Sequence, residues 1–156
     1  MTTVRCYVPL TPDQLTRLRA DRSLPGPLGG YAVTDALRAD LPGGDDDVWE
    51  HAALQQAARA QVQAGAPVVV AAVDLTEERV DRTPSGGAGV GVGDVDLPRV
   101  AALHLGDDVV TGEPSAVQEQ GQEVELSWYD TTELALVAEL VEALGTTGPA
   151  GTEPQT

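Results

Sequence analysis

Alternating and unbroken apolar runs along the chain predict several β-strands. Residues 3–8 place apolar side chains at every second position, which is the period of a half-buried strand. Residues 68–73 form a continuous β-branched run, typical of a strand buried on both faces. Residues 100–105 and 124–129 have the composition and alternation of further strands.

Helix start signals stand between and after these strands. The segment TPDQ at residues 11–14 predicts a capping box and a helix that ends near residue 22. Thr34 is the expected cap of a short helix over residues 35–39. The segment DTTE at residues 130–133 is a second capping box. It precedes an amphipathic helix whose predicted apolar stripe is Leu136, Val137, Leu140, Val141 and Leu144.

The longest predicted helix begins at the acidic run of residues 45–47 and ends before Gly65. Its expected apolar face carries Leu54, Ala58 and Val62, while its glutamines lie elsewhere around the helix.

Glycine and proline mark the expected connections. Residues 25–30 are predicted to be a loop. The glycine-rich residues 83–93 are expected to form a second loop that passes into an edge strand at Val90 and Val92. Residues 107–120 are open to two interpretations, a short helix from about Pro114 or a loop.

The resulting order, β-α-α-α-β-β-α-β-α, predicts an α+β fold arranged as a two-layer sandwich. Without its additional helices after the first strand and at the C-terminus, the order is the ferredoxin-like β-α-β-β-α-β pattern. The alternative is a mixed sheet with helices on both faces. We expect one globular domain over residues 1–145 and a disordered tail over residues 146–156.

Composition defines the core and limits the partners. The chain contains no Lys, Ile, Asn or Phe, which indicates a G+C-rich genome and a core of Val, Leu and Ala around Trp49 and Trp128. All basic residues are Arg, and the formal charge is −16. This charge argues against binding to nucleic acid or to an anionic membrane, and is compatible with solubility, a basic protein partner or nucleic-acid mimicry.

Cys6 is the single cysteine, so an internal disulfide or a cysteine-rich zinc site is excluded. It alternates with apolar residues, which predicts an inert, buried thiol. The N-terminal residues lack the plan of a signal peptide, and no apolar run approaches the length of a membrane span. We therefore expect a cytoplasmic protein.

Potential metal ligands have a simpler explanation. Asp47, Glu50 and His51 stand at helical spacing i, i+3, i+4 and would need further ligands, for which His104 with Asp107 or Asp108 is the obvious source. Acids at a helix start are, however, expected from the helix dipole alone. We therefore assign no metal ligand, no cofactor and no catalytic residue.

The remaining candidate residues lie near two strand ends. His104, inside a predicted strand, and Asp107, just after it, are candidates for a small-ligand or general-base site. Trp128 is most simply a core residue, whereas Tyr129 and Tyr7 are candidates to line a groove. These five residues form the predicted ligand- or partner-binding set.

Beyond these patterns, the chain carries in order the segments RCYVPLTPDQLTRL, YAVTDALR, EHAALQQAARA, VVVAAVDLT, VAALHLGD and ELSWYDTTEL. Through them, from Val4 to about Leu134, it resembles an uncharacterised family of small acidic actinobacterial proteins. The resemblance implies a bacterial cytoplasmic protein and implies no activity, cofactor or catalytic residue.

The function predicted from the residues is accordingly general. We expect a non-enzymatic binding or regulatory module that contacts a partner protein. The alternative is a small-ligand-binding protein or enzyme with its site near His104 and Asp107. The residues define neither the partner nor the oligomeric state.

Overall fold

A seven-stranded sheet organises the molecule, and the computed structural model describes residues 3–82, 87–112 and 123–147. The strand order is β5-β6-β3-β1-β4-β8-β9, all neighbours are antiparallel, and β2 pairs separately with β7. The helices are α1 (Pro12–Asp21), α2 (Asp35–Asp40), α3 (Asp46–Ala64), α4 (Asp107–Thr111) and α5 (Leu134–Thr147), with short 3₁₀ turns at Glu77–Arg79, Leu97–Arg99 and Thr131–Glu133. The strands are β1 (Thr3–Pro9), β2 (Ser23–Leu24), β3 (Leu28–Ala32), β4 (Val69–Thr76), β5 (Val80–Asp81), β6 (Gly89–Val92), β7 (Val95–Asp96), β8 (Val100–Gly106) and β9 (Leu126–Tyr129).

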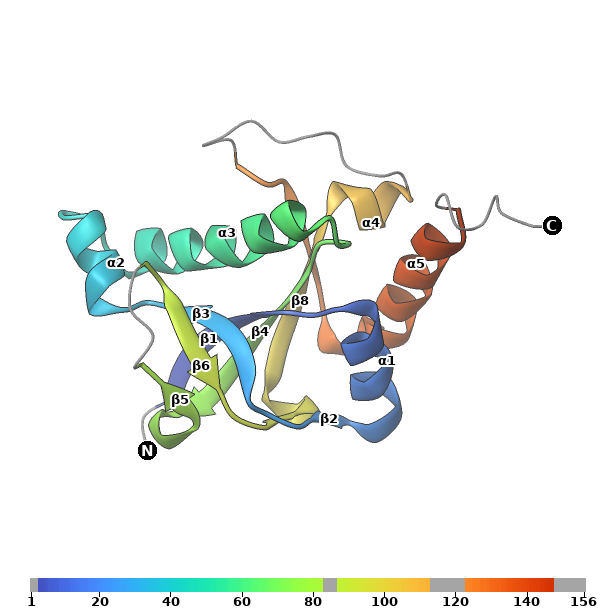
Figure 1. Ribbon diagram of the computed structural model, residues 1–156, viewed down its shortest axis with the longest axis horizontal. Coiled ribbons are helices and arrows are strands. Elements are labelled where there is room, and N and C mark those ends of the chain that lie inside the picture. Colours follow the sequence, from blue (N-terminus) through green and yellow to red (C-terminus); the bar gives the residue numbers. More distant parts are fainter. Residues whose placement is uncertain (1–2, 83–86, 113–122, 148–156) are drawn as a thin grey trace.

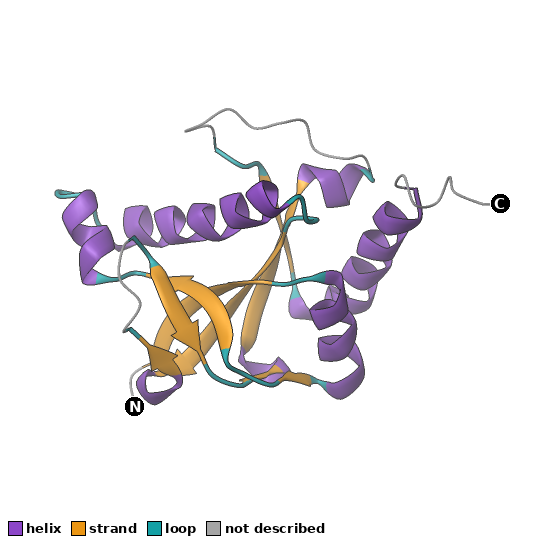
Figure 2. Ribbon diagram, viewed as in Figure 1, coloured by secondary structure: helices purple, strands orange, loops and turns teal. Residues whose placement is uncertain are grey.

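Helices cover both faces of this sheet. Successive residues of β1 point to opposite faces, so Cys6 and Val8 enter one core while Tyr7 enters the other. The first core is covered by α1 and α5 and the second by α3, as Figures 1 and 2 show. The α+β class is confirmed, but the two-layer arrangement is wrong. Both faces of the central strands are apolar, so each face needs a covering layer.

The ferredoxin-like order is not confirmed, because the sheet contains strands that the sequence pattern did not indicate. β3 includes Gly29 and Gly30, which were predicted to be in a loop, and Gly29 pairs with Gly91 of β6. A Cβ atom on Gly30 would lie 2.7 Å from the Val92 side chain. Glycine therefore permits a close approach within the sheet here, although it usually signals a loop.

The boundaries of other segments also differ from expectation. β6 is not at the edge of the sheet, because β5 pairs with its outer side. α4 begins at Asp107, directly after β8; Pro114, where the alternative helix was expected to begin, lies among residues 113–122, outside the described part. α5 continues to Thr147, and the rest of the predicted tail, residues 148–156, also lies outside it.

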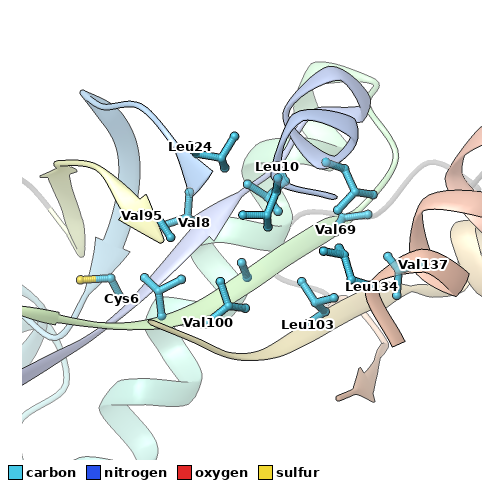
Figure 3. Close-up of a cluster of buried hydrophobic side chains, with 14 of the residues drawn as sticks. Cys6, Val8, Leu10, Leu24, Val69, Val95, Val100, Leu103, Leu134 and Val137 are labelled. Atoms are coloured by element: carbon cyan, nitrogen blue, oxygen red, sulfur yellow. The ribbon is translucent and has the colours of Figure 1, made fainter. Parts of the chain in front are cut away.

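The first core is built from Val, Leu and Ala side chains of the sheet, α1 and α5 (Figure 3). Cys6 lies within it, and burial is the main cause that raises the pKa of its thiol to about 11. The thiol therefore stays protonated at neutral pH and is a poor nucleophile, as expected from its place in the alternating pattern.

The predicted caps of α1 and α5 are present, and the predicted apolar stripe of α5 packs on the first core except at Leu136. The Thr11 hydroxyl accepts a hydrogen bond from the Gln14 amide at 3.1 Å, and Asp130 with Glu133 forms the second capping box. Leu136, predicted to be apolar-facing, is 45% exposed. The buried residues at the start and middle of the helix are Leu134, Val137, Ala138 and Val141.

α3 packs against the sheet through alanines, which are the most buried apolar residues along it. Ala53, Ala57 and Ala58 lie in the second core, whereas Leu54 and Val62 are only partly buried. The buried face of α3 is therefore rotated relative to the predicted one. Of the three predicted residues, only Ala58 is fully buried. Small side chains allow the helix to lie close to the strands.

Two glutamines of α3 are also buried, and both bind main-chain atoms of the strands or of the residues that enter them. The Gln61 side-chain amide donates to the Leu10 carbonyl oxygen at 2.8 Å and its Oε1 accepts from the Val69 amide at 2.8 Å. Gln55 makes the same pair of bonds to Val124, at 3.0 Å to its carbonyl oxygen and 2.8 Å from its amide. Each glutamine side chain thus gives main-chain groups one donor and one acceptor, as a neighbouring strand would.

We expect Gln61→Ala to lower the free energy of unfolding by about 2–4 kcal/mol, because it leaves a buried carbonyl and a buried amide without partners. Urea unfolding followed by circular dichroism measures this loss. Gln63→Ala, an exposed position two residues along the same helix, is the matched control and should change stability by less than about 0.5 kcal/mol. Equal effects of the two substitutions would contradict the role given to Gln61.

Candidate functional site

The structure brings together two of the predicted site residues, His104 and Trp128. They face each other across β8 and β9 as registered cross-strand partners. His104 shares its face of β8 with Ala102, a residue of the second core, so both side chains lie on the α3 side of the sheet. His104 is half-buried, whereas Trp128 is 62% exposed.

The expectation that Trp128 fills the core is wrong. Its alternation with apolar residues is real, but β9 is the last strand of the sheet, and α3 packs most extensively on β1, β3 and β4. The face of β9 therefore extends beyond the helix. Trp49, the other expected core aromatic, is half-buried where α2 meets α3, with the Arg38 guanidinium 5.4 Å from its ring centre.

The other predicted site residues lie apart from this pair. Tyr7 is buried beneath α3, and burial, followed by the charge of Glu50, raises the pKa of its phenol to about 12. Tyr129 pairs with Leu103 and packs against the first core, on the opposite face of the sheet. Asp107 is exposed at the start of α4, beyond the end of the strand that carries His104.

An ion pair that the sequence analysis did not predict lies on the α3 side of the sheet, the face that carries His104 and Trp128. The Arg5 guanidinium binds both carboxylate oxygens of Asp74, with distances of 2.6 and 3.1 Å across β1 and β4. Burial, and secondly the positive charge of Arg5, hold the pKa of His104 below its ordinary value. The His104 imidazole is therefore neutral at neutral pH, able both to donate and to accept a hydrogen bond.

The three residues of α3 considered as metal ligands, Asp47, Glu50 and His51, are not grouped into a metal site. The His51 imidazole Nε2 lies 3.0 Å from the Glu123 carboxylate, and both side chains are largely exposed. Within residues 3–82, 87–112 and 123–147, no three His, Cys, Asp or Glu side chains are grouped closely enough to hold a metal ion. His51 instead contacts Glu123, in the segment that enters β9.

Asp108, which the sequence offers beside Asp107 as a companion of His104, is a further functional candidate. It is only 6% exposed, although its neighbour Asp107 is exposed. Its Oδ2 accepts a hydrogen bond from the Val68 amide at 3.2 Å, while its Oδ1 is buried without a hydrogen-bond partner. Burial is the main cause that raises the pKa of this carboxyl group. Main-chain hydrogen bonds, foremost that of the Val68 amide, oppose this rise.

Comparison with known proteins identifies the family and leaves its activity undefined. The model of a family of unknown function, DUF6912, matches residues 4–138. The chain belongs to this family, so the predicted resemblance to an uncharacterised family is confirmed. No curated protein and no solved structure is significantly similar to the chain. Function must therefore be argued from the site itself.

None of the helices in the described part of the chain is both long enough and apolar enough to traverse a lipid bilayer.

We expect the free energy of unfolding of Asp108→Asn to increase, relative to that of the native protein, as the pH rises from about 3 to about 7. A carboxyl group with a raised folded-state pKa binds its proton more tightly in the folded protein. The native protein thus has an advantage at low pH that it loses as the pH rises through the raised pKa. Urea unfolding of both proteins at each pH measures the difference.

The control is Asp40→Asn, which removes one exposed carboxylate at the end of α2. A difference between Asp108→Asn and the native protein that stays constant across this pH range would contradict the burial argument.

Proposed function

We propose that this protein is a non-enzymatic binding module that docks an extended, basic segment of a partner protein along β9. The observation that carries this proposal is the 62% exposure of Trp128 on the last strand of the sheet. A large aromatic side chain in such a position is the residue type that most often anchors a protein interface.

β9 offers a suitable edge for strand addition. It pairs with β8 on one side, and no other strand of the described residues pairs with its second side. An extended peptide can bind such an edge through main-chain hydrogen bonds, with alternate side chains directed to each face. Trp128 would contact the side chains directed to the α3 side.

The charge of the chain indicates the partner's composition. A formal charge of −16 would repel acidic segments and steer basic ones. Glu125 directly precedes β9, and Asp107 begins α4, which packs near β9. A basic segment is therefore favoured, with an affinity that falls as salt increases. We also propose that the protein is cytoplasmic and of actinobacterial origin.

The alternative, a small-ligand or general-base site, retains one favourable observation, the neutral imidazole of His104 beside Trp128. Its suggested partner Asp107 stands three residues further along the chain, up to about 10 Å away along extended backbone. The two residues are not arranged as a hydrogen-bonded pair. We therefore rank this alternative below partner binding.

A random peptide display selection against the immobilised protein at low salt tests the proposal. We expect the enriched peptides to be rich in Arg and Lys, with these basic residues alternating with apolar residues along the peptide. Trp128→Ala should weaken a selected peptide roughly tenfold or more, because a central aromatic anchor is lost. Fluorescence anisotropy measures the affinities, and amide chemical shifts of β9 locate the binding.

The matched control is Leu136→Ala, which truncates an apolar side chain that is exposed elsewhere, on α5. It should leave the affinity unchanged. Peptides without a basic bias, or equal binding to the native protein and Trp128→Ala, would overturn the proposal.

A further inference from the structure

The direction of the main-chain groups of β9 follows from one hydrogen bond at the end of β8. The Gly106 amide donates to the Val68 carbonyl oxygen at 2.9 Å, so the main-chain groups of Gly106 face the β4 side. In an antiparallel sheet these groups face the two neighbouring strands alternately along each strand, so those of Leu105 face β9. Leu105 pairs with Ser127 in an unbroken register, and these two residues therefore exchange main-chain hydrogen bonds.

The same alternation directs the main-chain groups of Leu126 and Trp128 away from β8. Each of these residues stands next to Ser127 in the chain, so its N–H and C=O point to the opposite side of β9. No strand in the described part of the chain pairs with that side. The free edge of β9 therefore presents the donors and acceptors of two residues, Leu126 and Trp128, whose side chains share the α3 side of the sheet.

Side chains of the protein itself limit this edge at both ends. Before β9, both main-chain groups of Val124 are bound by the Gln55 side chain. After β9, the Asp130 amide donates to the Glu133 carboxylate at 3.0 Å, and the Asp130 carbonyl oxygen accepts from the Glu133 amide at 2.9 Å. Val124 and Asp130 are the residues to which a longer added strand would make its next hydrogen bonds. Those positions are already occupied, so the edge available to a partner is short.

We propose that β9 pairs with three consecutive residues of an antiparallel partner segment, of which the first and third hydrogen-bond to Trp128 and Leu126. An antiparallel segment completes all the available bonds within this length, whereas the slanted bonds of a parallel segment need a longer stretch. The middle residue lies opposite Ser127, and its own N–H and C=O point away from β9. Proline, which has no N–H, is therefore accepted at the middle position and rejected at the other two. This inference rests on the proposed function and adds to it the register, length and proline tolerance of the bound segment.

The test introduces one N-methyl group at a time into a peptide from the display selection, which removes one main-chain donor and leaves every side chain in place. We expect two sensitive positions, separated by one tolerant residue, and each should weaken binding roughly tenfold or more. The matched control is the N-methyl group on the middle residue, which should change the affinity about twofold at most, because that N–H points away from β9. Fluorescence anisotropy measures the affinities.

Amide hydrogen exchange of the native protein gives a second readout that needs no variant. In the free protein, the amides of Leu126 and Trp128 should exchange faster than those of Val124, Ser127 and Asp130, which have acceptors within the protein. A saturating amount of the unmethylated peptide should slow exchange at Leu126 and Trp128 roughly tenfold or more. Equal exchange of all five amides in the free protein would contradict the assignment of the free edge.

Trp128→Ala separates this inference from the proposed function, because it removes the aromatic anchor and keeps the main-chain groups of the edge. Weaker binding to Trp128→Ala, combined with uniform tolerance of N-methyl groups or with more than two sensitive positions, would refute the register alone. Equal binding to the native protein and Trp128→Ala, with the alternating N-methyl pattern retained, would instead refute the anchor and support the register. A peptide that protects neither amide of the edge would overturn both.

Discussion

The fold depends on hydrogen bonds between glutamine side chains of α3 and the main chain of the sheet. Gln61 joins the residue after β1 to the first residue of β4, while Gln55 holds Val124 beside the helix. Both side chains satisfy buried main-chain groups that would otherwise be costly. They also fix the position of α3 along the strands, which apolar contacts between small alanines would specify only weakly.

The same hydrogen bonds help to determine the position of the proposed docking site. Val124 is held by Gln55 immediately before β9, so the helix determines where the last strand begins. Leu126 of that strand packs against the second core, whereas Trp128 is exposed beside the neutral His104. The buried carboxylate of Asp108 lies near the beginning of the same strand. α3 thus helps to determine the position of this edge.

Much of the fold follows from local patterns, and the failures have physical causes. The capping boxes and the β-branched runs located α1, α5, β1, β4 and β8, because these signals depend on neighbouring residues. The glycine strand β3 was missed, since its pairing with β6 requires contacts between distant segments. Trp128 was misplaced and the Arg5–Asp74 pair was missed for a related reason. Alternation shows which residues share a face, but only strand order shows which face is covered and which residues are opposed.

The alanines on the buried face of α3 limit which substitutions this chain can accept. A larger residue at Ala53, Ala57 or Ala58 would lift the helix from the sheet, and a lift of less than one ångström would lengthen the Gln61 bonds beyond the usual range. Substitution there would therefore be opposed twice, by crowding and by the loss of polar contacts. Sequence drift should instead accumulate on the outward face of α3, where new side chains can change the surface without moving the scaffold.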